Sequence, residues 1–134
     1  MFAAMHNPMA AYKKVEIETG VESADPHKLI QMLFEGAMLS IAAASVHMRR
    51  NEAHDIARKG EAISKAINII SNGLKASLDM EAGGDLAVKL AALYDYMCNR
   101  LLHANVHNQP AVLDEVSHLL AELKGAWEQI EGKA

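Results

Sequence analysis

The chain has 134 residues, 51% of them apolar, with a formal net charge of −4 at pH 7 and a single cysteine, Cys98. This length gives one domain with a hydrophobic core and is too short for two. The acidic balance without a basic stripe argues against nucleic-acid binding, and the lone cysteine excludes an internal disulfide framework and is typical of a reducing compartment.

The composition favours helices. Aromatic residues make up only 4% of the chain, and Ala, Leu, Ile and Met supply most of the hydrophobicity; these residues are helix formers. The longest nearly apolar run, Gly36–Val46, is about half the length that a membrane span needs. The first residues lack the features of a targeting segment. We therefore expect a cytoplasmic protein without membrane insertion.

Residues 1–24 form an N-terminal segment that differs from the rest of the chain. Val15 to Thr19 alternates apolar and polar residues like an extended strand, and a lone strand has no pairing partner inside a helical bundle. Two interpretations have equal weight. The segment is either a disordered terminus or an apolar tail that covers a groove and can leave it.

The first helix is predicted to start at Asp25 and Pro26, because Asp caps free amide groups and Pro suits the first helical position. It ends at Arg49 and Arg50, whose positive charge is favourable at a helix C-terminus. Its apolar residues recur every three or four positions and predict one buried stripe: Leu29, Leu33, Ala37, Ile41, Ala44 and Met48.

Three further helices follow. The second is predicted from about Glu52 to Leu78, the third from Gly83–Gly84–Asp85 to about His107, and the fourth from Pro110 onward. The second has a stripe of Ile56, Ile63, Ile67, Ile70, Leu74 and Leu78, and the fourth has one of Val112, Val116, Leu119, Leu123, Trp127 and Ile130. Short connections between long amphipathic helices predict an all-α, antiparallel up-down four-helix bundle over residues 25–134.

Two tyrosines in the third helix, Tyr94 and Tyr96, point to a second functional surface. Residues two apart on a helix face directions about 200° apart, so both rings cannot enter one core. The core position is already filled by a stripe of Leu90, Leu93, Met97, Leu101 and Ala104. At least one tyrosine is therefore expected to face another surface. The alternative is a tyrosine at the rim that packs against a neighbouring loop.

The helices carry more apolar residues than one core needs. The first helix alone adds Ile30, Phe34, Met38, Leu39, Ala42, Ala43 and Val46 to its stripe, and the chain has eight methionines. Methionines often fill gaps in a core, but their flexible side chains also suit surfaces that re-pack around a ligand. The excess is consistent with a groove for an apolar peptide or helix, or with burial in a homo-oligomer.

Neither catalysis nor metal binding is expected. Glu115 and His118 have the Glu-x-x-His spacing of di-iron bundles, but such sites need two of these motifs and further carboxylates, and Glu115 and His118 should face solvent. His103 and His107 share a helix face near its end, where exposed histidines are common. No nucleophile has a supporting context, so we expect a non-enzyme without a cofactor.

Several segments in order resemble the family of flagellin-specific export chaperones, the FliS family. Phe34, where many members have Tyr, and the long Gly20–Ala24 linker are small departures. The matching segments are Ala11–Tyr12 with Val15 and Ile17, Ala24–Ala37, Lys65–Leu74 with Leu78–Asp79, Glu81–Gly84, Leu93–Met97, Leu102–Asn105 and Ala126–Trp127.

The resemblance implies a cytoplasmic chaperone that binds the C-terminal segment of flagellin. The bound segment would be kept from premature polymerisation and competent for secretion. The family also implies docking to the cytoplasmic domain of the flagellar export gate and, in some members, an anti-sigma factor partner. This interpretation predicts a monomer or weak dimer. The alternative is a homo-oligomeric bundle with a structural or scaffolding role and no client.

The expected client-binding residues have two origins. The resemblance implies Tyr12, in the tail, as a groove cover or direct contact, together with Ile17. Helix faces suggest Leu74, Leu78, Leu86 and Leu90 as an apolar floor, although these could equally be plain core. Tyr94 and Tyr96 line or rim the groove. Asn105 could satisfy the backbone of a bound peptide or could be a surface residue without a role.

Overall fold

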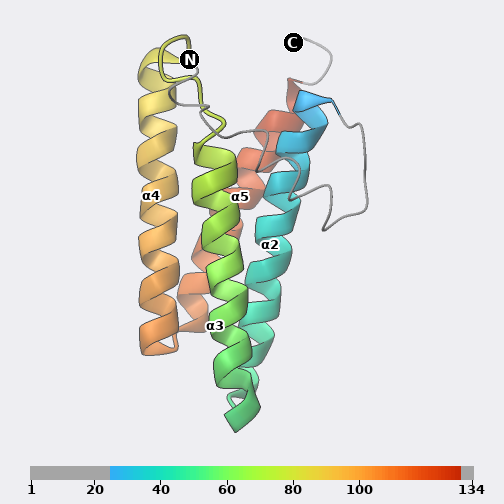
Figure 1. Ribbon diagram of the computed structural model, residues 1–134, viewed down its shortest axis with the longest axis vertical. Coiled ribbons are helices and arrows are strands. Elements are labelled where there is room, and N and C mark those ends of the chain that lie inside the picture. The colour runs from blue at the N-terminus through green and yellow to red at the C-terminus, as the bar shows by residue number, and fades with distance from the viewer. Residues whose placement is uncertain (1–24, 131–134) are drawn as a thin grey trace.

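A computed structural model of the protein describes residues 25–130 (Figure 1). Tyr12, Ile17 and the rest of the N-terminal segment lie outside the described residues. Every regular element in the described range is a helix, in the order α2 (Pro26–Arg50), α3 (Ala53–Asn68), the π-helix η1 (Ile69–Lys75), α4 (Gly84–His107) and α5 (Pro110–Gln129). The predicted all-α four-helix bundle is confirmed.

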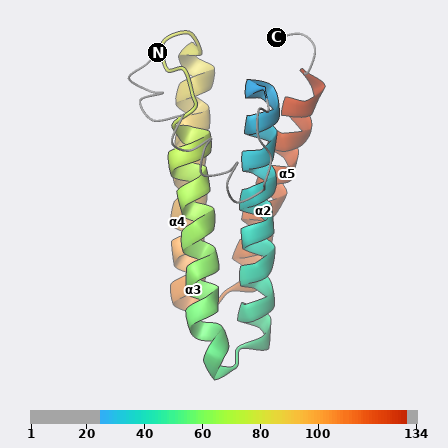
Figure 2. The same ribbon diagram turned by 45° about the vertical axis from the view of Figure 1, so that its right-hand side comes forward.

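The helices run alternately up and down. α3 and η1 form one rod that packs against both α2 and α4, and α5 packs against α2 and α4 from the other side. In this ring, α2 lies diagonally opposite α4, and α3 lies diagonally opposite α5 (Figures 1 and 2). Each helix therefore has two neighbours and one face toward solvent.

The predicted start of α2 and the predicted ends of α2 and α4 are confirmed. The Asp25 carboxylate accepts a hydrogen bond of 2.7 Å from the Lys28 backbone amide, with Pro26 as the first helical residue. α2 and α4 each end at an asparagine in the left-handed conformation, Asn51 and Asn108, both with φ of 52°. Asparagine tolerates this conformation better than most residues, so both helices stop where the chain must reverse.

The second helix is not α-helical over its whole predicted length. Its α-helical part ends at Asn68, the π-helix continues to Lys75, and a turn region follows. The adjacent residues Ile69 and Ile70 are both buried, as are Gly73 and Leu74. A uniform α-helix turns neighbouring residues to different faces, whereas a local π turn shifts this phase. Burial of two adjacent pairs therefore accompanies the change in helix type.

The buried stripes match the prediction best in α2, where all six predicted residues are buried. In α5 the prediction was partly wrong: Leu113 and Leu120 are fully buried, Leu119 and Leu123 are only partly buried, and Ile130 is exposed. α5 packs against two helices at once, so its buried face is broader than a single heptad stripe.

Ile56 was predicted to be buried but is 62% exposed. It lies seven residues before the buried Ile63 and so projects from the same face of α3. α3 extends beyond the end of α4 (Figure 1), and there α4 does not cover Ile56. The buried residue at this end is instead its neighbour, Asp55.

Of the described helices, α2 alone is long and apolar enough to cross a membrane by length and composition, with a mean hydropathy of 1.6 over its most apolar window. Within that window, 44% is buried inside the protein. This is typical of the core helix of a bundle, and the remaining apolar side chains of α2 form a second, outward face.

Candidate functional site

The two tyrosines of α4 lie in different environments, as predicted. Tyr94 is 4% exposed and belongs to the core; burial raises its pKa to about 12. Tyr96 is 43% exposed, and its hydroxyl donates a 2.6 Å hydrogen bond to Glu115 Oε2 of α5. The second surface that the tyrosine spacing required is therefore the seam between α4 and α5.

This seam is joined by a charged pair. Arg100 Nε donates a 3.0 Å hydrogen bond to Glu115 Oε1, so the Glu115 carboxylate is held by both Tyr96 and Arg100. The hydrogen bond from Tyr96 is the main cause of a lowered pKa for Glu115, and the same bond raises the pKa of Tyr96. Tyr96 is fixed in place rather than free.

The α4 and α5 helices separate beyond this contact. They are joined by the turn at Asn108 and Gln109 and lie farther apart at the other end (Figures 1 and 2). There α5 is tied to α2 instead. Trp127 Nε1 donates to the His27 carbonyl at 2.9 Å, His27 Nε2 donates to the Trp127 carbonyl at 2.9 Å, and the two rings stack with centroids 4.7 Å apart.

Apolar side chains line both helices where they separate. Helical periodicity carries the face of Arg100 and Tyr96 on to Leu93 and Leu86 in α4, and the face of Glu115 on to Leu119 in α5. We call this surface the α4–α5 face and define it by Leu86, Leu90 and Leu93 of α4, Leu119 and Leu123 of α5, and Ile130, which directly follows α5. Leu86 is 66% exposed and Ile130 is 43% exposed, while the other four are partly buried.

The residues expected to bind a client divide into three groups. Leu86 and Leu90 lie on the α4–α5 face, and Tyr96 lies at its edge. Leu74 and Tyr94 are in the core, with Leu78 packed against it. Asn105 is half-buried near the other end of α4, where its carbonyl accepts a 3.0 Å hydrogen bond from Lys59 Nζ. The structure thus brings the α4 leucines together and separates them from Asn105.

Four residues of the α4–α5 face were not among the expected client-binding residues: Leu93, Leu119, Leu123 and Ile130. In the sequence they belong to regular apolar stripes, which predict a core position. They remain at least partly exposed where α4 and α5 lie farther apart, and at that end α5 is hydrogen-bonded to α2 through residues 100 positions apart in the chain. No pattern within a single helix predicts these contacts between distant residues.

The histidine motifs are accounted for without a metal. Glu115 is held by Tyr96 and Arg100, and His118 is exposed and lies 3.2 Å from Glu122. His103 and His107 are exposed at the end of α4, with ring centroids 4.3 Å apart. Glu115 and His118 do not face the bundle interior, which a di-iron site would require.

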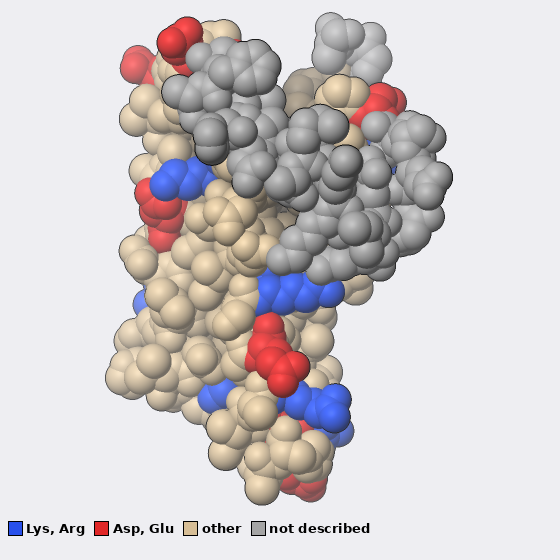
Figure 3. All heavy atoms as spheres, in the orientation of Figure 1, with Lys and Arg blue, Asp and Glu red and all other residues tan. Residues whose placement is uncertain are grey.

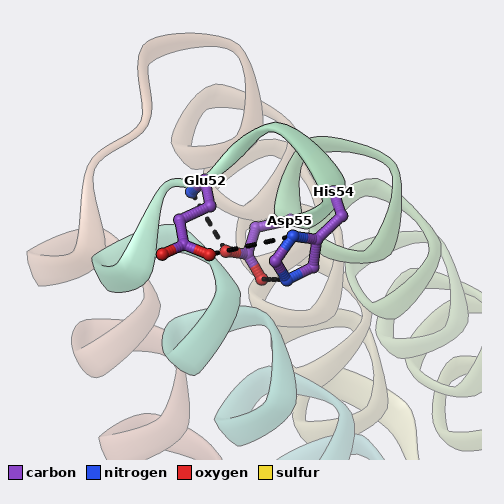
Figure 4. A group of neighbouring side chains, drawn as sticks. All are labelled: Glu52, His54 and Asp55. Atoms are coloured by element: carbon purple, nitrogen blue, oxygen red, sulfur yellow. Dashed lines mark hydrogen bonds and ion pairs between the residues drawn. The ribbon is translucent and has the colours of Figure 1, made fainter.

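A second group, Glu52, His54 and Asp55, has ligand atoms within 4.8 Å of one another (Figure 4). The Asp55 carboxylate, however, already accepts hydrogen bonds from Arg50 at 2.6 Å and from His47 Nδ1 at 2.7 Å, and from the Glu52 backbone amide at 3.0 Å. A cation would compete with the guanidinium for the same oxygens. The hydrogen bonds from Arg50 are the main cause of a strongly lowered pKa for Asp55. The group is best explained as a set of contacts that stabilises the turn between α2 and α3.

The face over α3 and α4 carries few charged side chains, and these form separate patches with uncharged surface between them (Figure 3). Exposed apolar residues of α4 on its outer side include Val88, Leu102 and Val106. Exposed apolar side chains therefore lie on several faces of this protein. The α4–α5 face differs because it combines partly buried leucines from two helices.

Comparison with known proteins identifies the family. Residues 8–134 match the family described as "Flagellar protein FliS". The chain is 51% identical to the flagellar secretion chaperone FliS of Salmonella typhimurium over 92% of this chain and 90% of that protein. It is 40% identical to FliS of Vibrio cholerae, over 94% and 90% of the two chains, and 47% identical to the flagellar secretion chaperone FliSB of Pseudomonas aeruginosa, over 91% and 94%. The chain belongs to the FliS family of flagellar secretion chaperones.

Proposed function

We propose that this protein is a cytoplasmic export chaperone that binds the C-terminal segment of flagellin and holds it in a monomeric, secretion-competent form. The observation that carries the proposal is the match to flagellar secretion chaperones along nearly the whole chain. Docking to the cytoplasmic domain of the export gate and to an anti-sigma factor belongs to the same proposal. No catalytic role is part of it.

The α4–α5 face supports this function because it offers apolar side chains in the geometry that suits an amphipathic helix. Recognition of this kind places the apolar residues of a client helix, at helical spacing, against the apolar side chains of α4 and α5. Leu86 is the most exposed of the six side chains that define this face. Burying a leucine fully is worth about 1.5–3 kcal/mol, so a few such contacts would hold a client segment reversibly.

In this mechanism the chaperone takes the place of the neighbouring filament subunits on the client segment. In the filament, the apolar face of the client segment packs against neighbouring subunits in coiled-coil contacts. A chaperone that covers this face removes the surface through which subunits would polymerise, and release uncovers it again. Tyr12 and Ile17 of the N-terminal segment would cover the α4–α5 face in the absence of client or contact the client directly.

Calorimetric titration with a synthetic C-terminal segment of flagellin from the same organism tests the proposal. We expect saturable one-to-one binding with a negative heat-capacity change, because apolar surface is buried. Leu86→Glu should weaken binding strongly. Ile56→Glu is the matched control, since Ile56 is 62% exposed at the opposite end of the bundle, compared with 66% for Leu86. Tyr12→Ala should change the affinity if the tail acts at this face.

Absence of binding by a folded protein would overturn the client assignment and would favour the scaffolding alternative. Equal weakening by Leu86→Glu and Ile56→Glu would retain the client but remove the α4–α5 face as its site.

A further inference from the structure

The facing edges of α4 and α5 carry charges of opposite sign. At the contact that joins the two helices, the base Arg100 and the hydroxyl of Tyr96 belong to α4, and the acid Glu115 belongs to α5. Two turns from this contact, each helix carries one more charge of the same sign as before. These are Lys89, seven residues before Tyr96, and Glu122, seven residues after Glu115.

Lys89 and Glu122 lie at one level of the bundle. α4 and α5 are antiparallel (Figure 1), so seven residues back along α4 and seven forward along α5 lead in the same direction, by about 10 Å. Seven residues are close to two helical turns, so Lys89 lies on the edge of α4 that carries Tyr96, and Glu122 on the edge of α5 that carries Glu115. A base thus stands across from an acid where the helices lie farther apart.

These two charges are not joined to each other as Arg100 and Glu115 are. Within residues 25–130, no hydrogen bond or ion pair involves the exposed side chain of Lys89. The Glu122 side chain is 65% exposed, and its one ion pair in that range is with His118 of its own helix, at 3.2 Å. The charges that meet at the joined end of the seam are therefore left open to a partner at the other end.

Both charges adjoin the leucines of the α4–α5 face. Lys89 is three residues after Leu86 and four before Leu93, and Glu122 is three residues after Leu119. Side chains three or four positions apart are neighbours on the surface of a helix. A helix whose apolar side covers these leucines would therefore have a base along one flank and an acid along the other.

We propose that Lys89 and Glu122 set the direction in which a client helix lies on the α4–α5 face. The inference rests on the proposed function. The client helix carries acidic side chains on the flank along α4 and basic side chains on the flank along α5. Turned end for end, the same helix keeps its apolar side on the leucines but exchanges its flanks, and like charges then meet on both edges. The apolar contacts hold the client, and the charges select one of its two directions.

Asp85 limits the basic part of the α4 edge. It is four residues before Lys89, in the first turn of α4, where an acid is favourable beside the helix N-terminus. The basic part therefore begins at Lys89 and continues to Arg100. The client side chains that select the direction are those that lie level with Leu93, between these two bases.

Two synthetic amphipathic peptides of about 18 residues, roughly 27 Å long as helices, test the proposal. They share one stripe of leucines and contain no tryptophan. The first has glutamates on one flank of the stripe and lysines on the other, and the second has these flanks exchanged. Each peptide is prepared with a dansyl group at either its N-terminus or its C-terminus. Trp127, the only tryptophan of the protein, lies near the end of α5, so energy transfer from it reports which terminus of the peptide is nearby.

The wild type should give strong transfer to one terminus of the first peptide and to the opposite terminus of the second. Lys89→Glu together with Glu122→Lys should exchange the two results. Lys89→Glu alone makes both edges acidic and should remove most of the difference between the termini. The flagellin segment, labelled in the same way, should respond to both variants as the peptides do. In about 1 M salt, where charges are screened beyond about 3 Å, the preference should be lost while the peptides stay bound.

Arg58→Glu together with Glu61→Lys is the matched control. It also exchanges a base and an acid on an exposed helix surface, but on α3, the helix diagonally opposite α5, and it should leave the direction unchanged. The affinity for the flagellin segment should change by less than roughly tenfold in every variant, because exposed ion pairs contribute little. Circular dichroism checks that the variants fold.

Equal transfer to both termini in the wild type, or the same terminus near Trp127 for both peptides, would overturn the proposal. So would binding of the flagellin segment but not of the peptides, or a control variant that changes the direction as well. These results would leave the proposed function intact. Failure of the flagellin segment to bind would instead overturn the proposed function and this inference with it.

Discussion

Asp55 shows how one residue can organise a turn between two helices. Its side chain is 1% exposed, and its carboxylate is shared by Arg50 and His47 from the end of α2 and by the Glu52 amide at the start of α3. Burial of a carboxylate is unfavourable unless it is paired and hydrogen-bonded, and here every oxygen is used. The carboxylate thereby fixes the angle at which the chain leaves α2 and enters α3.

Asp55→Asn should make the stability of the protein less dependent on acid. Hydrogen bonds from Arg50 lower the pKa of Asp55 in the folded state, so its contribution is complete above the unfolded-state pKa, about 3.9, and is lost as pH falls toward the folded-state pKa. Asn cannot ionise and lacks this contribution at every pH. Urea denaturation followed by circular dichroism should therefore give a large difference in unfolding free energy at neutral pH that shrinks toward about pH 2.

A difference that stays constant over this pH range would mean that the ionised carboxylate is not what stabilises the turn. Asp114→Asn serves as the control. Its partner Arg49 is also in α2, but Asp114 is 65% exposed, and exposed pairs contribute little to stability.

At the scale of elements, the ends of helices were more predictable than their type. Asp25 with Pro26, and Pro110 after Gln109, are local signals for helix starts, and the structure follows them. The π-helix at Ile69–Lys75 has no such signal. It lies where another helix approaches closely, since a Cβ atom at Gly73 would come 2.9 Å from Leu33 Cδ2 of α2. Close approach of this kind is a property of the assembled bundle.

Gly60 of α3 and Gly73 of η1 should respond oppositely to substitution by alanine. Gly60→Ala should stabilise the protein by about 0.5–1 kcal/mol, because alanine favours the helix and, apart from its chain neighbours and the nearby backbone of its own helix, no atom lies within 4 Å of the new Cβ. Gly73→Ala carries the same helix gain but must displace Leu33, and overpacking of this kind costs about 1–3 kcal/mol. Chemical denaturation of both variants measures the difference.

If Gly73→Ala were as stabilising as Gly60→Ala, Leu33 would have room to move and the contact would not be tight. A double variant, Gly73→Ala with Leu33→Val, separates the two effects. It relieves the clash while retaining the alanine, and it should recover part of the loss. Leu33→Val alone supplies the reference.

At the scale of the molecule, the sequence predicted an apolar excess but not its location. Leu39 and Leu93 both sit among apolar neighbours in the sequence, yet Leu39 faces solvent on the diagonal away from α4, and Leu93 lies where α4 and α5 separate. The difference arises from which helices are neighbours and from the tie between His27 and Trp127. These relations join residues far apart in the chain, so periodicity within one helix cannot supply them.

The proposed client should stabilise the whole bundle through this geometry. A ligand that binds only the folded state adds about 2.7 kcal/mol at a concentration of 100 times its Kd, which for a chain of this size corresponds to a rise in Tm of roughly 10 °C. Differential scanning calorimetry with the flagellin segment should show this rise for the wild type and for Ile56→Glu, and a much smaller one for Leu86→Glu at the same peptide concentration.

The client is expected to stabilise the folded protein because it would bury side chains of the α4–α5 face. Leu90, Leu93, Leu119 and Leu123 are only partly buried in the free protein, and a helix docked along the α4–α5 face would cover them. Binding would then join α4 to α5 at the end where, among residues 25–130, hydrogen bonds join α5 to α2. An unchanged Tm at a peptide concentration that saturates the calorimetric titration would show that the segment binds folded and unfolded chains equally. That result would exclude a preformed α4–α5 face as its site.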